Sequence, residues 1–304
     1  MPARAHDHLP AAARLGVLGW PVAHSRSPAM QNAALAELGL SDWRYQLLPV
    51  PPEAFAQTVR ALGASGLRGA NVTIPHKEAA LAVATTATDR ARAIGAANTL
   101  TFGADGAIHA DNTDAPGFLA ALPAPPAPGG TALVLGAGGS ARAVVHALVE
   151  AGVDVAVWNR TAARAAALTG DLGGRAVAAA RPADLLVNCT AVGLGQASTG
   201  FEELPLTADS IGTYATVVDL VYRPGGTPFL DAAQAAGCSV VDGLEMLVQQ
   251  GALSLEAWTG LPAPIRVMRE AVRRDLPIAP HEPRPSPSAT RGRTGPSDGG
   301  GARP

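Results

Sequence analysis

Lys77 and Asp114 are the two residues of this sequence that could form a proton-handling pair. A lysine ammonium can supply a proton to a reacting oxygen, and a carboxylate can hold that ammonium in place. Lys77 lies at a predicted helix start, where a cation is mildly disfavoured, and this favours a chemical role. The structural alternatives are a solvated lysine, and an N-cap at Asp114 for a helix that begins at Pro116. Spacing alone leaves these alternatives open.

Other polar residues near predicted strand ends could bind a small anion. Ser25 and Ser27 precede a predicted helix start at Pro28, and two hydroxyls with free helix N–H groups form a receptor for a carboxylate. Ser27 is also predicted to be the N-cap of that helix. Further polar side chains at predicted strand or hairpin ends are Asn71, Thr73 and Asn98. Because ligands of open α/β sheets bind beyond the carboxyl ends of the strands, we expect these groups to share one site.

The elements that must position these residues alternate between strands and helices. Apolar runs predict strands at residues 14–19, 43–50 and 67–74, with helices at 28–39, 52–64 and directly after Lys77. This alternation predicts a mostly parallel sheet with helices on both faces. Residues 96–102 and 107–110 predict an antiparallel hairpin on the same sheet.

A glycine-rich turn between a strand and a helix predicts a dinucleotide site. The apolar run 131–135 is followed by a helical pattern through Glu150, and between them stand Gly136, Ala137, Gly138, Gly139, Ser140 and Ala141. Gly136 permits the tight turn, Gly138 has no Cβ to block a pyrophosphate, and Ala141 lets the helix pack closely on the strand. The helix N-terminus then attracts the phosphates.

The next predicted strand, residues 153–158, indicates which dinucleotide is bound. In NAD sites this strand usually ends in an acid that accepts the ribose 2′-hydroxyl. Here it is followed by Asn159, Arg160 and Thr161, with Arg164 one turn further on. Two guanidinium groups suit a 2′-phosphate, so the sequence predicts NADP. The structural alternative is that both arginines are solvated residues at a helix start.

Composition excludes several classes of protein. The 304 residues suffice for about two domains, and 47% hydrophobic against 16% charged residues allows a sizeable core. A formal net charge of -2 gives no reason to expect nucleic acid or a membrane surface as a partner. Two cysteines argue against a disulfide framework and a structural zinc site, so we expect no metal. Neither a membrane span nor a signal peptide is predicted, which indicates a cytoplasmic protein.

The pattern divides the chain into two α/β domains. We predict an N-terminal, mostly parallel α/β substrate domain and a doubly wound, Rossmann-type NADP-binding domain, entered through the proline-rich residues 123–130. Helices predicted at 244–258 and 265–275 are expected to return to the first domain. The predicted boundaries are a flexible arm at 1–13, the substrate domain at 14–115 and 243–276, the NADP domain at 116–242, and a disordered tail at 277–304.

Taken together, the motifs resemble the shikimate dehydrogenase family. The likeness runs in family order over residues 14–275. The matching segments are residues 19–28, 69–77, 94–99, 111–114, 136–141, 159–161, 188–190, 219–222 and 242–250.

The resemblance implies an oxidoreductase that reversibly reduces 3-dehydroshikimate to shikimate with NADPH, a step of aromatic amino-acid biosynthesis. It implies that Ser25 and Ser27 hold the substrate carboxylate. It further implies that Lys77 is the acid/base or the electrostatic partner of the C3 oxygen, oriented by Asp114. The residues implied to hold the ring hydroxyls are Asn71, Thr73, Asn98, Asp114, Tyr222 and Gln250. The residues implied to bind NADP are Gly136, Ala137, Gly138, Gly139, Ser140, Ala141, Asn159, Arg160, Thr161, Arg164, Thr190 and Gly243. A monomer or a homodimer is expected.

Three alternatives differ in residues that can be checked. A quinate/shikimate dehydrogenase that uses NAD would prefer an acid at Asn159 and tolerate threonine at Ser27. A non-catalytic NADP-binding regulator would lack the Lys77–Asp114 pair. Another two-domain NADP enzyme, such as a methylene-tetrahydrofolate dehydrogenase, would not need the paired serines.

Overall fold

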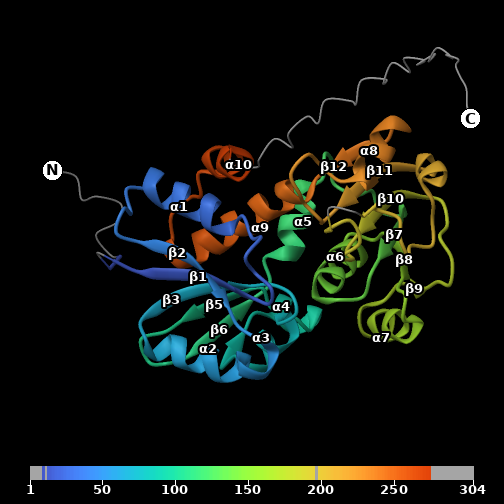
Figure 1. The fold of residues 1–304 in the computed structure, drawn as a ribbon. Coiled ribbons are helices and arrows are strands. Elements are labelled where there is room, and N and C mark those ends of the chain that lie inside the picture. Colours follow the sequence, from blue (N-terminus) through green and yellow to red (C-terminus); the bar gives the residue numbers. More distant parts are fainter. Residues whose placement is uncertain (1–8, 11, 196–197, 275–304) are drawn as a thin grey trace, which may run out of the picture.

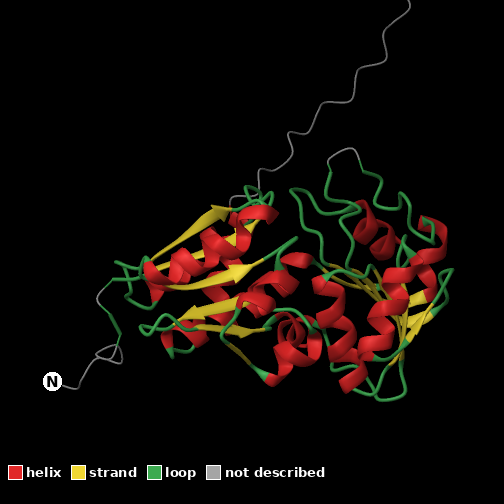
Figure 2. Ribbon diagram, turned by 90° about the horizontal axis from the view of Figure 1, so that it is seen from below, coloured by secondary structure: helices red, strands yellow, loops and turns green. Residues whose placement is uncertain are grey.

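The computed structural model describes residues 9–10, 12–195 and 198–274. These residues build two six-stranded sheets, each with its own helices (Figure 1). The predicted tail at 277–304 and most of the predicted N-terminal arm lie outside the described residues. Figure 2 shows the two sheets as separate layers of strands with helices packed around each.

The first sheet has the strand order β2-β1-β3-β5-β6-β4. Its strands are β1 (Arg14–Gly19), β2 (Arg44–Pro49), β3 (Leu67–Val72), β4 (Thr86–Ala87), β5 (Thr99–Phe102) and β6 (Ile108–Asp111). β1 pairs in parallel with β2 and β3, and β4 pairs in parallel with β6, whereas β5 is antiparallel to both of its neighbours. One strand therefore runs against the other five, which confirms a mostly parallel sheet that carries an antiparallel hairpin.

Helices cover both faces of the first sheet (Figure 1). They are α1 (Ser27–Glu37), η1 (Pro52–Ala54), α2 (Phe55–Ala64), α3 (Lys77–Val83) and α4 (Asp89–Ile94), joined by α9 (Gly243–Thr259) and α10 (Ile265–Arg274) from the end of the described chain. One core cluster joins α1, α9 and α10 to β1, with Met30, Trp258 and Met268 fully buried. A second cluster packs α2 and α3 on the opposite face.

The second sheet has the order β12-β11-β10-β7-β8-β9, and every pair in it is parallel. Its strands are β7 (Thr131–Leu135), β8 (Asp154–Trp158), β9 (Arg175–Ala176), β10 (Ala183–Asn188), β11 (Tyr214–Asp219) and β12 (Ser239–Val241). Its helices are α5 (Asp114–Ala121), α6 (Gly139–Glu150), α7 (Ala162–Leu172), η2 (Ala208–Thr213) and α8 (Pro228–Ala235). The chain turns back between β7 and β10, so the order is that of a doubly wound dinucleotide-binding sheet. The predicted fold class is confirmed.

Helix α9 links the two halves of the structure. Its Asp242 N-cap accepts a hydrogen bond from the Glu245 N–H at 2.8 Å, and Gly260 ends the helix in the left-handed region at φ 68°. Trp258 donates to the Leu100 carbonyl of β5 at 3.0 Å. Gly117 of α5 faces α9 so closely that a Cβ there would lie 2.7 Å from the Cβ of Gln250. Helix α5 packs on both α9 and α6, and thus lies between the two sheets.

Several local predictions need correction. Helix α5 begins at Asp114, not at Pro116, and the Asn112 side chain accepts the first free N–H groups, so Asp114 is not its N-cap. Ser27 is the first helical residue of α1, and its side chain makes no capping hydrogen bond. The short elements β4 and α4 were not predicted, because two and six residues carry too little periodicity.

Candidate active site

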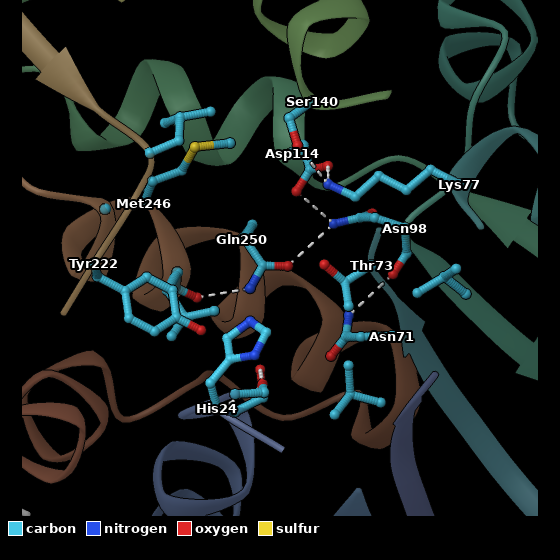
Figure 3. A pocket seen from close by; sticks show the side chains of 17 residues that line it. His24, Asn71, Thr73, Lys77, Asn98, Asp114, Ser140, Tyr222, Met246 and Gln250 are labelled. Atoms are coloured by element: carbon cyan, nitrogen blue, oxygen red, sulfur yellow. Dashed lines mark hydrogen bonds and ion pairs between the residues drawn. The ribbon is translucent and has the colours of Figure 1, made fainter. Parts of the chain in front are cut away.

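A pocket at the carboxyl edge of the first sheet faces the glycine turn of the second (Figure 3). It is lined by every residue that was predicted to be catalytic or to hold substrate: Ser25, Ser27, Asn71, Thr73, Lys77, Asn98, Asp114, Tyr222 and Gln250. Two residues predicted to bind cofactor, Ser140 and Gly243, line the same pocket. These side chains come from segments that span most of the described chain, so the topology brings them together.

Lys77 and Asp114 form a buried ion pair at one end of this pocket. The Lys77 Nζ lies 2.6 Å from Asp114 Oδ2, and the two residues are 9% and 4% exposed. Lys77 is the first residue of α3, and the preceding His76 is fixed by stacking on Phe55 and by a 2.7 Å contact with the Val50 carbonyl. A buried charge pair of this kind needs hydrogen bonds on its remaining atoms to be tolerated.

Asn98 supplies the second hydrogen bond to the Asp114 carboxylate. Its Nδ2 donates to Asp114 Oδ1 at 2.8 Å and lies 3.0 Å from Gln250 Oε1 (Figure 3). Its Oδ1 accepts the Thr113 N–H at 2.7 Å, which fixes the orientation of the amide. One carboxylate oxygen thus faces Lys77 and the other faces Asn98.

A fully buried polar layer lies beneath these residues. Asn71 Oδ1 accepts the Tyr45 hydroxyl at 2.8 Å, and Asn71 Nδ2 donates to Ser254 Oγ at 2.8 Å. Ser254 also lies 2.8 Å from Thr99 Oγ1 and 3.1 Å from Thr113 Oγ1. The layer therefore joins Asn71 to the segment that carries Asn98 and Asp114, and it holds each amide in a defined orientation.

Ser25, Ser27 and Tyr222 form the opposite end of the pocket. Ser25 Oγ lies 3.2 Å from Ser27 Oγ at the start of α1. Burial raises the pKa of the Tyr222 hydroxyl, while hydrogen bonds to the Arg26 backbone and the Ser25 side chain act in the opposite sense. Burial also raises the pKa of Tyr45 well above its ordinary value, against the effect of a hydrogen bond with Ser27. Both phenols therefore stay neutral; Tyr45 donates to Asn71 beneath the pocket, while the Ser25, Ser27 and Tyr222 hydroxyls line it and can bind a carboxylate.

A second pocket opens at the point where the strand order of the second sheet reverses. It is lined by loops that follow β7, β8 and β10. The predicted cofactor residues that line it are Gly136, Ala137, Gly138, Asn159, Arg160, Thr161, Arg164 and Thr190. Gly136 has φ 109°, which only glycine adopts easily, and a Cβ on Gly138 would meet nothing within 4 Å. The turn therefore leaves open space for a phosphate at the start of α6.

The far end of this second pocket is basic. Arg160 and Arg164 are exposed at the end of β8 and in α7, and Arg160 forms an ion pair with Glu203. Thr190 is held by Asn188, whose Oδ1 accepts both the N–H and the hydroxyl of Thr190. A donor set of two guanidinium groups and small polar side chains fits a phosphomonoester.

Four predicted cofactor residues do not line the second pocket: Ser140, which lines the first pocket, and the small residues Ala141, Gly139 and Gly243. Ala141 is fully buried in the core beneath the turn. Gly139 faces Lys77, where a Cβ would lie 2.8 Å from the lysine Cβ. Gly243 begins α9, where a Cβ would lie 2.5 Å from the Leu220 carbonyl oxygen. Their small size therefore permits close packing around both pockets.

Some residues of the site were not predicted. Tyr45 and Ser254 lie under the pocket, and Met246 and His24 line it. Tyr45 lies on β2 between Arg44 and Gln46, and Ser254 interrupts an apolar stretch of α9. That polar interruption is the one signal that sequence reasoning could have used.

Family models match the chain in three consecutive parts. The shikimate dehydrogenase substrate binding domain matches residues 17–100, shikimate/quinate 5-dehydrogenase matches 122–212, and the shikimate 5′-dehydrogenase C-terminal domain matches 243–273. A shikimate dehydrogenase (NADP(+)) of Methylobacterium radiotolerans is 49% identical over 280 residues, which is 86% of this chain and 97% of the relative. The chain belongs to the shikimate dehydrogenase family. The resemblance predicted from the motifs is confirmed.

Solved structures agree with this assignment. The shikimate 5-dehydrogenase of Thermus thermophilus in complex with NADP(H) and shikimate is 48% identical, with a TM-score of 0.77 over 86% of this chain and 99% of that chain. Shikimate dehydrogenase from Aquifex aeolicus is 35% identical, with a TM-score of 0.79 over 86% and 98%. The fold also occurs in a 5-ketofructose reductase of Gluconobacter, 32% identical with a TM-score of 0.70 over 86% and 98%. The fold alone therefore does not determine the substrate, which depends on the residues of this chain's own site.

In residues 9–10, 12–195 and 198–274 no helix has the length and apolar character needed to cross a bilayer. Across the same ranges, no group of three or more His, Cys, Asp or Glu side chains is arranged to hold a metal ion.

Proposed function

We propose that this chain is an NADP-dependent shikimate dehydrogenase, which reversibly reduces 3-dehydroshikimate to shikimate. The observation that carries the proposal is the buried Lys77–Asp114 pair, which shares one pocket with the Ser25, Ser27 and Tyr222 hydroxyls. A carboxylate receptor at one end and a proton donor at the other suit a small hydroxy- or keto-acid.

The substrate ring is held between these two ends. The Ser25 and Ser27 hydroxyls bind the carboxylate. The ring hydroxyls are bound by Asn71, Thr73, Asn98, Asp114, Tyr222 and Gln250. The buried hydrogen bonds of Asn71 and Asn98 fix which amide atoms point toward the ring, so the site discriminates between hydroxyl positions.

The proton is handled at the C3 oxygen. Lys77 Nζ has three N–H donors, of which one goes to Asp114 Oδ2 and one to Ser140 Oγ. The third can face the substrate oxygen, stabilise charge that develops on it, and supply the proton. Asp114 keeps the ammonium in this position. NADPH, when bound, supplies the hydride that reduces C3.

The second pocket fits the cofactor in its chemistry. The open turn at Gly138 and the N-terminus of α6 would hold the pyrophosphate. Arg160 and Arg164 would hold the 2′-phosphate, which accounts for a preference for NADP over NAD. The remaining residues assigned to the cofactor are Gly136, Ala137, Gly139, Ser140, Ala141, Asn159, Thr161, Thr190 and Gly243.

We further propose that the enzyme is cytoplasmic. It acts on small molecules alone and has no nucleic acid or membrane partner. Every residue assigned to the two pockets comes from one chain, so a monomer or a homodimer can carry a complete site.

The test is an initial-rate measurement of nucleotide reduction, with shikimate or quinate crossed against NADP or NAD. Turnover that strongly favours shikimate with NADP supports both the carboxylate receptor and the arginine pair. Comparable rates with quinate or NAD would instead indicate a broader quinate/shikimate dehydrogenase. Binding of NADP without turnover in any combination would indicate a non-catalytic regulator.

A further inference from the structure

Two residues in the first turn of α6, Ser140 and Gly139, contact Lys77. Ser140 Oγ lies 2.9 Å from Lys77 Nζ (Figure 3). Gly139 packs on the aliphatic part of the same lysine, since a Cβ on Gly139 would lie 2.8 Å from the Lys77 Cβ and 3.1 Å from its Cδ. The cofactor turn therefore contacts the catalytic lysine along its length.

Arg142, one turn into α6, fixes this turn against the first sheet's helices. Its Nε donates to the Ile94 carbonyl at the end of α4 at 2.6 Å, and its Nη1 lies 2.9 Å from Asp171 Oδ2 of α7. Gly95 adopts φ 74°, and a Cβ there would lie 2.7 Å from the Arg142 Nη2, so the guanidinium lies directly on this backbone. One side chain thus connects α4, α6 and α7.

These contacts restrict the direction in which the Lys77 ammonium can point. Asp114 alone would leave the flexible four-carbon side chain free to rotate about a single ion pair. A second acceptor at Ser140, on a different element, defines the direction of the third N–H, which faces the pocket. Ser140 belongs to the same turn that faces the phosphates, so the turn that receives the cofactor also orients the lysine.

We propose that Ser140 is a positioning residue for Lys77, and that Arg142 holds the first turn of α6 in place for this purpose. The proposal rests on the proposed function, because it assigns Ser140 a part in the same reaction. It differs from a simple cofactor contact, which would affect nucleotide binding and leave the chemical step unchanged.

The experiment compares Ser140→Ala, Ser140→Thr and the wild type, with Ser239→Ala as a control on the exposed strand β12. For each protein, kcat, KM for shikimate and the dissociation constant of NADPH by fluorescence titration are measured. Thermal unfolding is followed to show that each variant folds. We expect Ser140→Ala to lower kcat roughly ten- to hundredfold, the size of one lost hydrogen bond to a charged group. NADPH affinity should stay within twofold, and Ser140→Thr, which keeps the hydroxyl, should recover most of the rate.

A further readout separates orientation from general damage to the fold. Loss of orientation should lower kcat and leave KM for shikimate within a few-fold, and the rate should return in Ser140→Thr, whereas damage to the fold would lower the unfolding temperature of both variants. Arg142→Met should lower kcat in the same sense, because the turn loses its hydrogen bond to the Ile94 carbonyl.

The outcomes are distinguishable. A Ser140→Ala variant with wild-type kcat and weakened NADPH binding would overturn the positioning role and leave a cofactor contact only. Equal losses of rate in Ser140→Ala and Ser140→Thr would also overturn it, since the hydroxyl would then not matter. Absence of turnover in the wild type would instead contradict the proposed function itself.

Discussion

Asp114→Asn tests whether the carboxylate, and not merely its shape, organises the site. Asp114 accepts Lys77 on Oδ2 at 2.6 Å and Asn98 on Oδ1 at 2.8 Å, and only 4% of the residue is exposed. An asparagine offers one oxygen to these two donors, so its NH2 group must face either an ammonium or another amide. Asn98 cannot turn over to compensate, because its Oδ1 already accepts the Thr113 N–H.

The size of the effect follows from this geometry. A hydrogen bond between charged groups contributes about 1.5–3 kcal/mol, so its loss in the transition state lowers kcat roughly ten- to hundredfold. KM for NADP should stay within twofold, because Asp114 lies outside the second pocket. The assay is initial-rate oxidation of shikimate with NADP, together with a thermal melt of each protein.

Asp111→Asn is the matched control for this variant. Asp111 lies three residues earlier and forms an ion pair with Arg90 at 2.8 Å, but it does not line the pocket. We expect kcat within twofold of the wild type for this control. An Asp114→Asn variant that folds and retains wild-type kcat would refute the assignment of Asp114 as the group that holds Lys77.

Two further predictions concern cofactor choice and pH. Arg160→Gln should raise KM for NADP at least tenfold and leave KM for NAD unchanged, because only NADP carries the 2′-phosphate. Arg181→Gln, at an exposed position just before β10, should change neither constant. Burial raises the pKa of Asp219 to about 6, so between about pH 4 and 6 the folded chain binds more protons than the unfolded chain. The free energy of unfolding contributed by this group should therefore fall as pH rises, by up to about 1.4 kcal/mol per pH unit. The measurement is urea unfolding at several pH values. The decrease of the unfolding free energy with pH should be absent in Asp219→Asn and retained in the control Asp231→Asn. An unchanged decrease in Asp219→Asn would contradict the explanation.

Local sequence signals predicted a large part of the fold and of both pockets. The run of Gly136, Gly138 and Ala141 between an apolar strand and a helix predicted the doubly wound sheet, since few other contexts need that spacing. Short apolar runs ending in polar residues placed Asn71 and Thr73 at a strand end. Those features depend on residues that are close in sequence.

Contacts between distant segments were beyond prediction. Ser254 lies 183 positions from Asn71, and nothing local to either residue indicates that they meet. The contact between Ser140 and Lys77 depends likewise on how the two sheets are placed. Spacing alone did not exclude that Asp114 caps a helix, which is the usual role of an aspartate at such a position. In the structure the Asn112 side chain accepts the first N–H groups of α5 instead, so the Asp114 carboxylate is available to pair with Lys77.

The most direct test of the account compares Lys77→Ala with the wild type in both rate and substrate binding. General acid–base catalysis by one side chain contributes on the order of 10²–10⁴ in rate. We expect kcat to fall by about that factor, while the shikimate dissociation constant, measured by calorimetry, changes only a few-fold because the serines and amides remain. A folded Lys77→Ala protein with unchanged kcat would contradict the central claim that Lys77 handles the proton.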